Sequence, residues 1–272
     1  MAWTTLAAAL FPQGHAITEQ DDFLSGTALV AGQTVAVIGT TRHAAIGVEI
    51  ALAQARAVLH TVRAAPGRPI VLLVDTQGQR LRHRDEMLGI QRYMAHLGKS
   101  LELARQRGHR IVALVYDQAL SGGFVSSGLM ADACYALPDA AIRVMGLAAM
   151  ARITKVPEAA LAELARSNPV FAPGPENYRR MGGLEAIWDG DLAAALATAI
   201  ATAPAPALAR SPDTAQAAPP PTDDRAALGL ARGGRRYAYP VMAAVAGDAP
   251  AAPASMHAAA RLTDGPSGVD AG

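Results

Sequence analysis

Two glycine-containing turns are the segments of this chain whose residues could do chemistry. One is Asp75-Thr76-Gln77-Gly78-Gln79-Arg80 and the other is Ser121-Gly122-Gly123. Each follows a run of apolar residues typical of a buried parallel strand, and α/β sheets bind ligands at the carboxyl ends of such strands. Two turns on successive strands can therefore converge on one ligand atom.

Backbone N–H groups are the chemistry that these turns offer. A glycine pair that opens a helix presents unpaired N–H groups at the positive end of the helix dipole, where an enolate or a tetrahedral oxyanion could be held. The expected donors are Gly78 or Gln79 in the first turn and Gly122 and Gly123 in the second, with Ser121 shaping that turn or donating a hydrogen bond. Taken singly, each glycine is explained as well by a tight turn or by close helix packing.

A basic segment follows the first turn, with Arg80, Arg82, His83 and Arg84 within five residues. Such a segment could attract a substrate carboxylate, a phosphopantetheine phosphate or an acidic carrier protein, and Arg80 and Arg82 are the candidates for that role. A solvated helix start, or a salt-bridged face between subunits, is the alternative that the residues leave open.

The elements that must position both turns can be read from periodicity. Residues 27–39 predict a hairpin that opens the fold, with its turn at Gly32-Gln33, and the spacing of apolar residues predicts a helix over 47–62. Continuous apolar runs predict strands over 69–75 and 111–116. The remaining predicted elements are a loop over 76–84, helices over 85–107, 124–131, 157–166, 176–181 and 192–202, and short strands over 134–137 and 141–145. This succession indicates an α/β fold with mainly parallel pairing.

Composition limits the classes of function. Lys and Arg (24) balance Asp and Glu (23), so the chain lacks the positive field of a nucleic-acid-binding protein. The single cysteine, Cys134, excludes an internal disulfide and predicts a cytoplasmic protein. We expect no signal peptide and no membrane span. His43, His60, His83, His96 and His109 lack the spacing or the nearby carboxylates of a metal site, so no metal is expected.

The chain divides by composition into four parts. Residues 1–202 are predicted to form one catalytic domain, and 203–227 an Ala/Pro-rich linker. Residues 228–247 contain Arg232, Arg235, Arg236, Tyr237 and Tyr239 and are a candidate docking segment for a partner, with a solvated tail as the alternative. Residues 248–272 are expected to be a disordered tail.

Several segments carry a family resemblance. VAVIGTTRH, RPIVLLVDTQGQRL and IVALVYDQALSGGFVSSGLMADACYALPDAAIRVMG resemble the crotonase-like core of the acyl-CoA carboxyltransferases, whose corresponding loops read like DTPG and GGSGGAL. YMAHLGKSLELAR, MARITKVP and ENYRRMGGLEAIW are most similar to the gamma subunits of biotin-independent malonate decarboxylases. The resemblance covers about residues 30–189. Gln77 departs from the carboxyltransferase pattern, which usually has Pro there.

The resemblance implies a crotonase/ClpP-like superhelix of repeated ββα units and an active site shared with a beta subunit of the same fold. The implied reaction is decarboxylation of a malonyl thioester on an acyl carrier protein, giving an acetyl thioester and carbon dioxide. This chain is then expected to bind no cofactor and to need no biotin. The phosphopantetheine arm of the carrier would bring the substrate, and an acyl carrier protein transferase would be a further subunit of the complex.

Three other interpretations remain. A Clp-type serine peptidase would use Ser121 as nucleophile, but no histidine occurs between His109 and His257 to act as its base. A crotonase-fold hydratase would need a carboxylate after the glycine pair, and residues 122–130 contain none. A noncatalytic scaffold subunit is the third interpretation.

Overall fold

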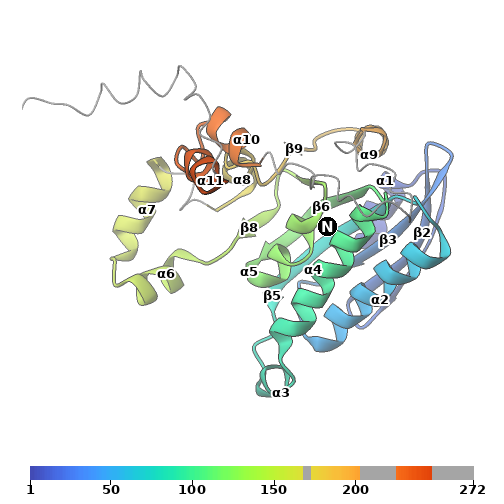
Figure 1. The fold of residues 1–272 in the computed structure, drawn as a ribbon, viewed down its shortest axis with the longest axis horizontal. Coiled ribbons are helices and arrows are strands. Elements are labelled where there is room, and N and C mark those ends of the chain that lie inside the picture. Colours follow the sequence, from blue (N-terminus) through green and yellow to red (C-terminus); the bar gives the residue numbers. More distant parts are fainter. Residues whose placement is uncertain (168–172, 203–224, 247–272) are drawn as a thin grey trace, which may run out of the picture.

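The computed structural model describes residues 1–167, 173–202 and 225–246, in which a mixed β-sheet is flanked by helices (Figure 1). The strands are β1 (His15–Gln20), β2 (Phe23–Val30), β3 (Gln33–Thr40), β4 (Ala44–Ile46), β5 (Ile70–Gln79), β6 (Ile111–Leu120), β7 (Ala133–Ala136), β8 (Ala141–Arg143) and β9 (Ala186–Ile187). Their order is β1-β2-β3-β5-β6-β7-β9, with β4 also paired to β5 and β8 to β6. The first two pairings are antiparallel and the others parallel, which confirms the predicted α/β class.

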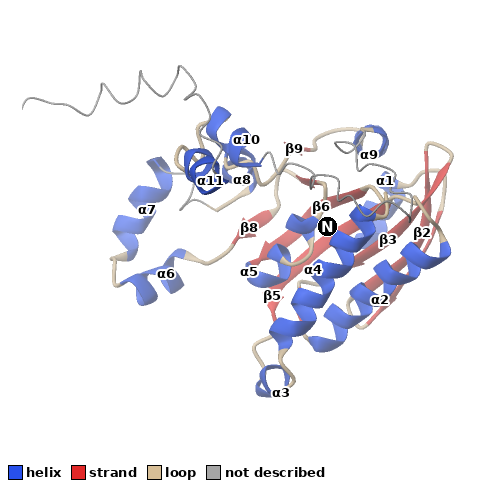
Figure 2. Ribbon diagram, in the orientation of Figure 1, coloured by secondary structure: helices blue, strands red, loops and turns tan. Residues whose placement is uncertain are grey.

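The helices connect and cover these strands. They are α1 (Trp3–Leu10), α2 (Val48–Ala64), α3 (His83–Met87), α4 (Ile90–Gln106), α5 (Ser121–Val125), α6 (Leu147–Thr154), α7 (Glu158–Ser167), α8 (Pro175–Arg180), α9 (Leu192–Ala201), α10 (Arg225–Ala231) and α11 (Ala238–Ala246), with a 3₁₀ turn over Gly128–Met130. Figure 2 shows α2 and α4 lying side by side over the sheet, while α6 and α7 project away from it.

Strands β5 and β6 each have two differently paired halves. Ile70–Leu73 of β5 pairs with β3, and the end of the strand, Thr76–Gln79, pairs with β4. Likewise Val112–Val115 of β6 pairs with β7, and Gln118–Leu120 pairs with β8. The register between β5 and β6 shifts between Val74 and Thr76, so the chain bends there. Two strand segments followed by a helix form the unit that repeats.

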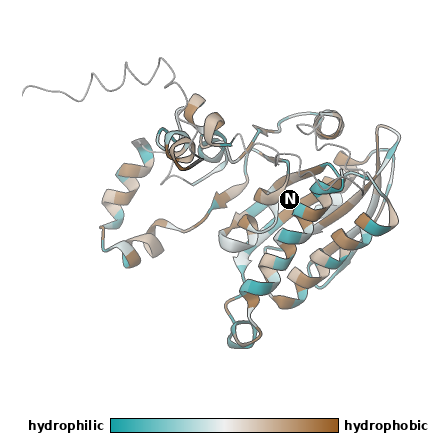
Figure 3. Ribbon diagram, viewed as in Figure 1, coloured by the Kyte–Doolittle hydropathy of each residue, from teal (hydrophilic) through white to brown (hydrophobic). Residues whose placement is uncertain are grey.

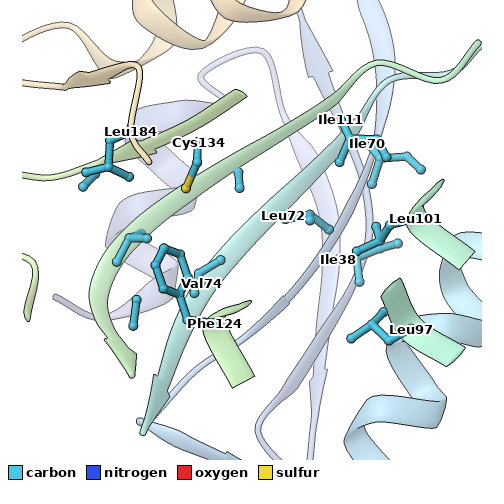
Figure 4. Close-up of a cluster of buried hydrophobic side chains, with 14 of the residues drawn as sticks. Ile38, Ile70, Leu72, Val74, Leu97, Leu101, Ile111, Phe124, Cys134 and Leu184 are labelled. Atoms are coloured by element: carbon cyan, nitrogen blue, oxygen red, sulfur yellow. The ribbon is translucent and has the colours of Figure 1, made fainter. Parts of the chain in front are cut away.

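The core lies on both faces of β5 and β6, which is why their sequences read as continuous apolar runs. Alternation places Ile70, Leu72 and Val74 on the face covered by α4, where Leu97 and Leu101 pack (Figure 4). Val71 and Leu73 lie on the opposite face, in the cluster that includes Leu6, Leu10 and Leu196 of α1 and α9. In Figure 3 the central strands are hydrophobic and α4 carries hydrophilic residues along its length.

Several predicted boundaries are wrong. The hairpin turn is Ala31-Gly32, both with positive φ (50° and 78°), one residue before the predicted pair, and α1 and β1 precede the hairpin. The predicted helix over 85–107 is two helices, because Gly89 (φ 76°) turns the chain between α3 and α4. The predicted loop over 76–84 begins as strand, and the predicted helix over 124–131 is α5 plus the 3₁₀ turn.

The segment over 225–246 packs on the main domain. Arg232 donates to the carbonyls of Arg179 and Leu184, at 2.9 and 2.7 Å. A Cβ at Gly234 would lie 2.1 Å from the Arg180 carbonyl oxygen, so only glycine fits that contact. On α11 and the residue before it, Tyr237, Val241 and Val245 are exposed. The linker expected over 203–227 is described only from residue 225, and the tail expected over 248–272 lies outside the described residues.

Candidate functional site

The two glycine turns are in contact. Gly78 (φ 102°) is the penultimate residue of β5, and Gly123 lies in α5 directly after β6. A Cβ on Gly123 would lie 3.0 Å from Gly78 Cα and 3.1 Å from Ile46 Cδ1, and a Cβ on Gly78 would lie 2.9 Å from Ser121 Cβ. Glycine is therefore required at position 78, because of the positive φ and this contact, and a side chain at Gly123 would force its neighbours to shift.

Thr76 fixes the first turn. Its side chain is fully buried, donates to the carbonyl of Ala44 at 2.6 Å and accepts from the Gly78 N–H at 2.9 Å. The Gly78 N–H is consequently engaged within the turn, which corrects its expected role as a donor to a ligand. The donor that the first turn can offer is the alternative, Gln79. The Arg80 N–H points to β4, where it donates to Ile46, so strand alternation directs the Gln79 N–H to the opposite edge, toward β6 and α5.

Two serines fix the second turn. The carbonyl of Gly122 accepts from the Ser126 N–H at 3.0 Å and from its hydroxyl at 2.8 Å. Because C=O and N–H point in opposite directions across a trans peptide, these bonds also set the direction of the Gly123 N–H. Ser127, which is buried, donates its hydroxyl to the Gly123 carbonyl at 2.6 Å.

The Gly122 N–H has a partner inside the chain. It donates to the side-chain oxygen Oε1 of Gln79 at 3.1 Å. This contact joins the two turns a second time, next to the contact between Gly78 and Gly123. A side-chain carbonyl of the first turn thus lies where the second turn offers a donor.

Ser121 has a strained backbone, and within the residues that the structure describes its hydroxyl bonds a carbonyl group and not a base. Its φ is 51°, a conformation that non-glycine residues rarely adopt, at the junction of β6 and α5. Its hydroxyl donates to the carbonyl of Val144 at 2.8 Å. Ser121 therefore shapes the turn and ties it to the segment after β8, and this geometry does not activate it as a nucleophile.

Arg80 and Arg82, both expected to bind substrate, have different surroundings. Arg82 donates from Nε and Nη2 to the carboxylate of Asp85, at 2.7 and 3.1 Å, and lies 3.5 Å from Glu49. Asp85 is fully buried, and the hydrogen bond from Arg82 holds its pKa below the ordinary value. The Asp85 carboxylate also accepts from the N–H of Val48 at the start of α2. Arg82 thus fixes the loop on α2.

Arg80 is half-buried, and its side chain makes no hydrogen bond or ion pair with any residue in the described ranges. Its Cδ lies near Gly47, where a Cβ would be 3.4 Å away. Arg80 comes two residues after Gly78. Of the two arginines, it is the one whose charge is available to a ligand at the turns.

A histidine and two carboxylates gather at the bend of β5. His43 Nε2 lies 3.2 Å from Asp117 Oδ1 and 3.7 Å from Asp75 Oδ1, and the N-terminal ammonium of Met1 lies 2.9 Å from Asp117. The expectation that His43 lacks nearby carboxylates is wrong, because the turn before β4 brings it to Asp75 of β5 and Asp117 of β6. These three side chains could hold a cation.

Hydrogen bonds within the chain also account for Asp75. Its two carboxylate oxygens accept from the N–H groups of His43 and Gln118, at 2.9 and 3.2 Å, so it ties the turn to β6. Burial raises the pKa of Asp75.

Several side-chain hydrogen bonds of the site could have been predicted from residue spacing in the sequence. Thr76 precedes Gly78 by two residues, the spacing at which a threonine hydroxyl bonds a backbone N–H. Ser126 and Ser127 lie four residues after Gly122 and Gly123, the spacing of hydroxyl-to-carbonyl bonds in a helical turn. The pairing of Arg82 with Asp85 follows the i, i+3 spacing.

No helix in the described ranges is long and apolar enough to cross a membrane. Segments next to the two turns in the sequence carry single exposed apolar side chains. Leu81 lies in the loop before α3, Met87 ends α3, Val125 ends α5 and Val144 follows β8; they are 83%, 74%, 45% and 53% exposed.

Comparison with known proteins gives three kinds of match. The family model described as malonate decarboxylase gamma subunit matches residues 41–249. A curated protein of Malonomonas rubra, malonyl-S-ACP:biotin-protein carboxyltransferase, is 37% identical over 151 residues, which are 52% of this chain and 52% of that protein. This chain thus spans about half the length of that relative.

Solved structures match the fold. One chain of a Pseudomonas malonate decarboxylase hetero-tetramer, solved in complex with coenzyme A, has a TM-score of 0.65 at 24% identity, with 75% of this chain and 89% of that chain covered. A transcarboxylase 12S, solved with methylmalonyl-coenzyme A and methylmalonic acid, has a TM-score of 0.63 at 20% identity, with 80% and 44% covered. These likenesses confirm the predicted crotonase-like carboxyltransferase fold.

Proposed function

This chain belongs to the malonate decarboxylase gamma subunit family, and from that premise we propose that it forms, with a beta subunit, the site that decarboxylates malonyl-S-acyl carrier protein. The products are the acetyl thioester and carbon dioxide. The observation that carries the proposal is the contact between Gly78 and Gly123, which sets the two turns side by side and supports a shared site for the N–H groups of Gln79 and Gly123.

The reaction requires stabilisation of an enolate. The bond between the carboxylate carbon and the α carbon breaks, carbon dioxide leaves, and the electron pair moves onto the thioester oxygen. Protonation of the α carbon then gives the acetyl thioester. Preorganised N–H donors facing that oxygen stabilise the charge as it develops, and removal of one such donor lowers kcat by about 100- to 1000-fold in other enzymes. We assign the donors to Gln79 and Gly123.

Arg80 has a role in binding and not in the bond-breaking step. The substrate carboxylate loses its charge as carbon dioxide forms, so a tight ion pair with an arginine would stabilise the ground state more than the transition state. The Arg80 guanidinium therefore suits the phosphate of a phosphopantetheine arm or the acidic carrier protein. The carrier brings the substrate, and this chain supplies no cofactor of its own.

The partner would cover the two turns. Exposed Leu81, Met87, Val125 and Val144 flank them, and the solved Pseudomonas malonate decarboxylase is a hetero-tetramer. We propose that the beta subunit covers this surface and excludes water from the enolate. Exposed Val241 and Val245 of α11 make 228–247 a second candidate segment for docking that subunit. The acyl carrier protein and its transferase are proposed as further subunits, and the cytoplasm as the compartment.

The test is reconstitution. We expect little activity from this chain alone and carbon dioxide release from malonyl-S-acyl carrier protein when the beta subunit is added. Full activity in the isolated chain would exclude a shared site. Full activity in the isolated beta subunit would support the scaffold interpretation.

A second candidate is carboxyl transfer to biotin, which the name of the Malonomonas relative favours. The carboxylate would then pass to a biotin-carrying protein and not leave directly as carbon dioxide. We expect release to continue in the presence of avidin without any biotin protein. Release that depends on a biotin protein and stops with avidin would favour the transferase.

A further inference from the structure

The side-chain carboxamide of Gln79 reaches the second turn. The side-chain oxygen Oε1 accepts from the Gly122 N–H at 3.1 Å, and a Cβ on Gly122 would lie 3.2 Å from the same oxygen. The contact sits beside the close approach of Gly78 and Gly123, so Gln79 Oε1 lies among the backbone groups to which the enolate is assigned.

The side-chain oxygen of Gln79 and the thioester oxygen of the substrate have similar hydrogen-bonding chemistry. A carboxamide oxygen and a thioester oxygen are both carbonyl acceptors of an N–H hydrogen bond. A thioester oxygen that reached the Gly122 N–H would therefore have to displace Gln79 Oε1. The Gly122 N–H would then join the N–H groups of Gln79 and Gly123 as a third donor.

The turns are fixed while the Gln79 side chain can move. Thr76, Ser126 and Ser127 hold the backbone of both turns through hydroxyl groups. The Gln79 side chain is only half-buried and has three rotatable bonds, so it can leave by a change of rotamer without backbone movement. Met94 Cε, which would lie 3.6 Å from a Cβ on Gly122, is the other side chain near this position.

We propose that the Gln79 carboxamide occupies the Gly122 N–H in the absence of substrate and is displaced by the thioester carbonyl. This inference rests on the proposed function. It makes Gln79 a residue that sets specificity, because a small molecule held by few contacts cannot offset the loss of the internal hydrogen bond. A thioester carried on a long arm has further contacts and can.

Gln79→Met tests the proposal, because Met keeps the length of the side chain but is a poor acceptor. In the complex with the beta subunit, we expect KM for the malonyl thioester to fall about two- to tenfold, the value of one net hydrogen bond, with kcat within twofold. Gln13→Met is the matched control: Gln13 Oε1 accepts from the Gly32 N–H at 2.9 Å, at an exposed hairpin turn.

A second measurement does not depend on turnover. In the full-length chain labelled with ¹⁵N-glycine, the Gly122 amide resonance should shift in Gln79→Met and exchange faster with solvent, and Gln13→Met should leave it in place. An unchanged Gly122 resonance, an unchanged KM, or a tenfold loss of kcat at constant KM would overturn the proposal. If the wild-type complex does not decarboxylate the malonyl thioester, the proposed function is rejected. If the Gly122 resonance nevertheless shifts in Gln79→Met, the hydrogen bond between Gln79 and Gly122 still stands.

Discussion

Gly78 and Gly123 are in close contact: a Cβ on Gly123 would lie 3.0 Å from Gly78 Cα, tighter than most side chains pack. The two residues are 45 positions apart in the sequence, and parallel pairing of β5 with β6 brings them together. Their contact sets the geometry of the site, and the predictions below follow from it and from the bonds that support it.

Replacing Gly123 should stop turnover. In Gly123→Val the added side chain meets the backbone of Gly78 and the side chain of Ile46, so the two turns must separate. We expect kcat to fall by at least about 100-fold, as on loss of one oxyanion donor, while the complex with the beta subunit still forms. Steady-state kinetics and gel filtration check this.

Gly98→Ala is the control for that variant. A Cβ at Gly98, in the middle of α4, would meet only Met130 Cε, at 3.9 Å. Its activity should match the wild type. Normal turnover in Gly123→Val would reject the assignment of the donors.

Thr76→Val should destabilise the chain by about 1–3 kcal/mol, because it leaves the Ala44 carbonyl and the Gly78 N–H without their buried hydroxyl partner. Thr76→Ser keeps the hydroxyl and should recover most of that free energy of unfolding. Urea denaturation of both variants measures the difference. Equal stability of the Val and Ser variants would show that the hydroxyl does not hold the turn.

Asp85→Asn should lower the free energy of unfolding by about 2 kcal/mol at pH 7, because the buried carboxylate loses its charge-assisted bonds from Arg82. The pKa of Asp85 is lowered in the folded chain, so the unfolded chain binds more protons as the pH falls below about 5. The stabilisation is therefore complete above that pH and is lost as the pH falls through the folded pKa. Denaturation from pH 3 to 7 should show the wild type approaching the variant at the acid end.

Substitution of the two arginines of the basic segment should affect different properties, substrate binding for Arg80 and stability for Arg82. Arg80→Gln should raise KM for the carrier-linked substrate about fivefold at low salt and leave kcat nearly unchanged, with only a small effect on stability, since its guanidinium makes no hydrogen bond or ion pair in the described part of the chain and acts on Asp85 only through its charge. Arg82→Gln should instead lower the urea midpoint, because buried Asp85 loses its partner. Kinetics at two salt concentrations and denaturation curves of both variants test this. A KM effect in Arg82→Gln alone would reverse the assignment.

Local pattern in the sequence determined the central strands and the position of both turns. Ile70–Val74 and Ile111–Val115 are apolar without interruption because helices cover both faces of β5 and β6, and the glycines follow at the strand ends. The order of strand, turn and helix therefore sufficed to predict an α/β fold and a site near Gly78 and Gly122. Short elements such as α1, β1 and β4 had no comparable signal.

Only the tertiary structure decided which polar groups of the site are already paired with other groups of the chain. Gln79 Oε1 meets the Gly122 N–H because β5 and β6 end at the same place, and His43 meets Asp75 and Asp117 because a turn brings it to the bend of these strands. Arg82 and Asp85 are close in sequence, yet burial of Asp85 against the start of α2 is a matter of packing. A hydrogen bond between residues 43 positions apart depends on distances that no local pattern of residue types encodes, so the donors available to a ligand could not be counted from the sequence.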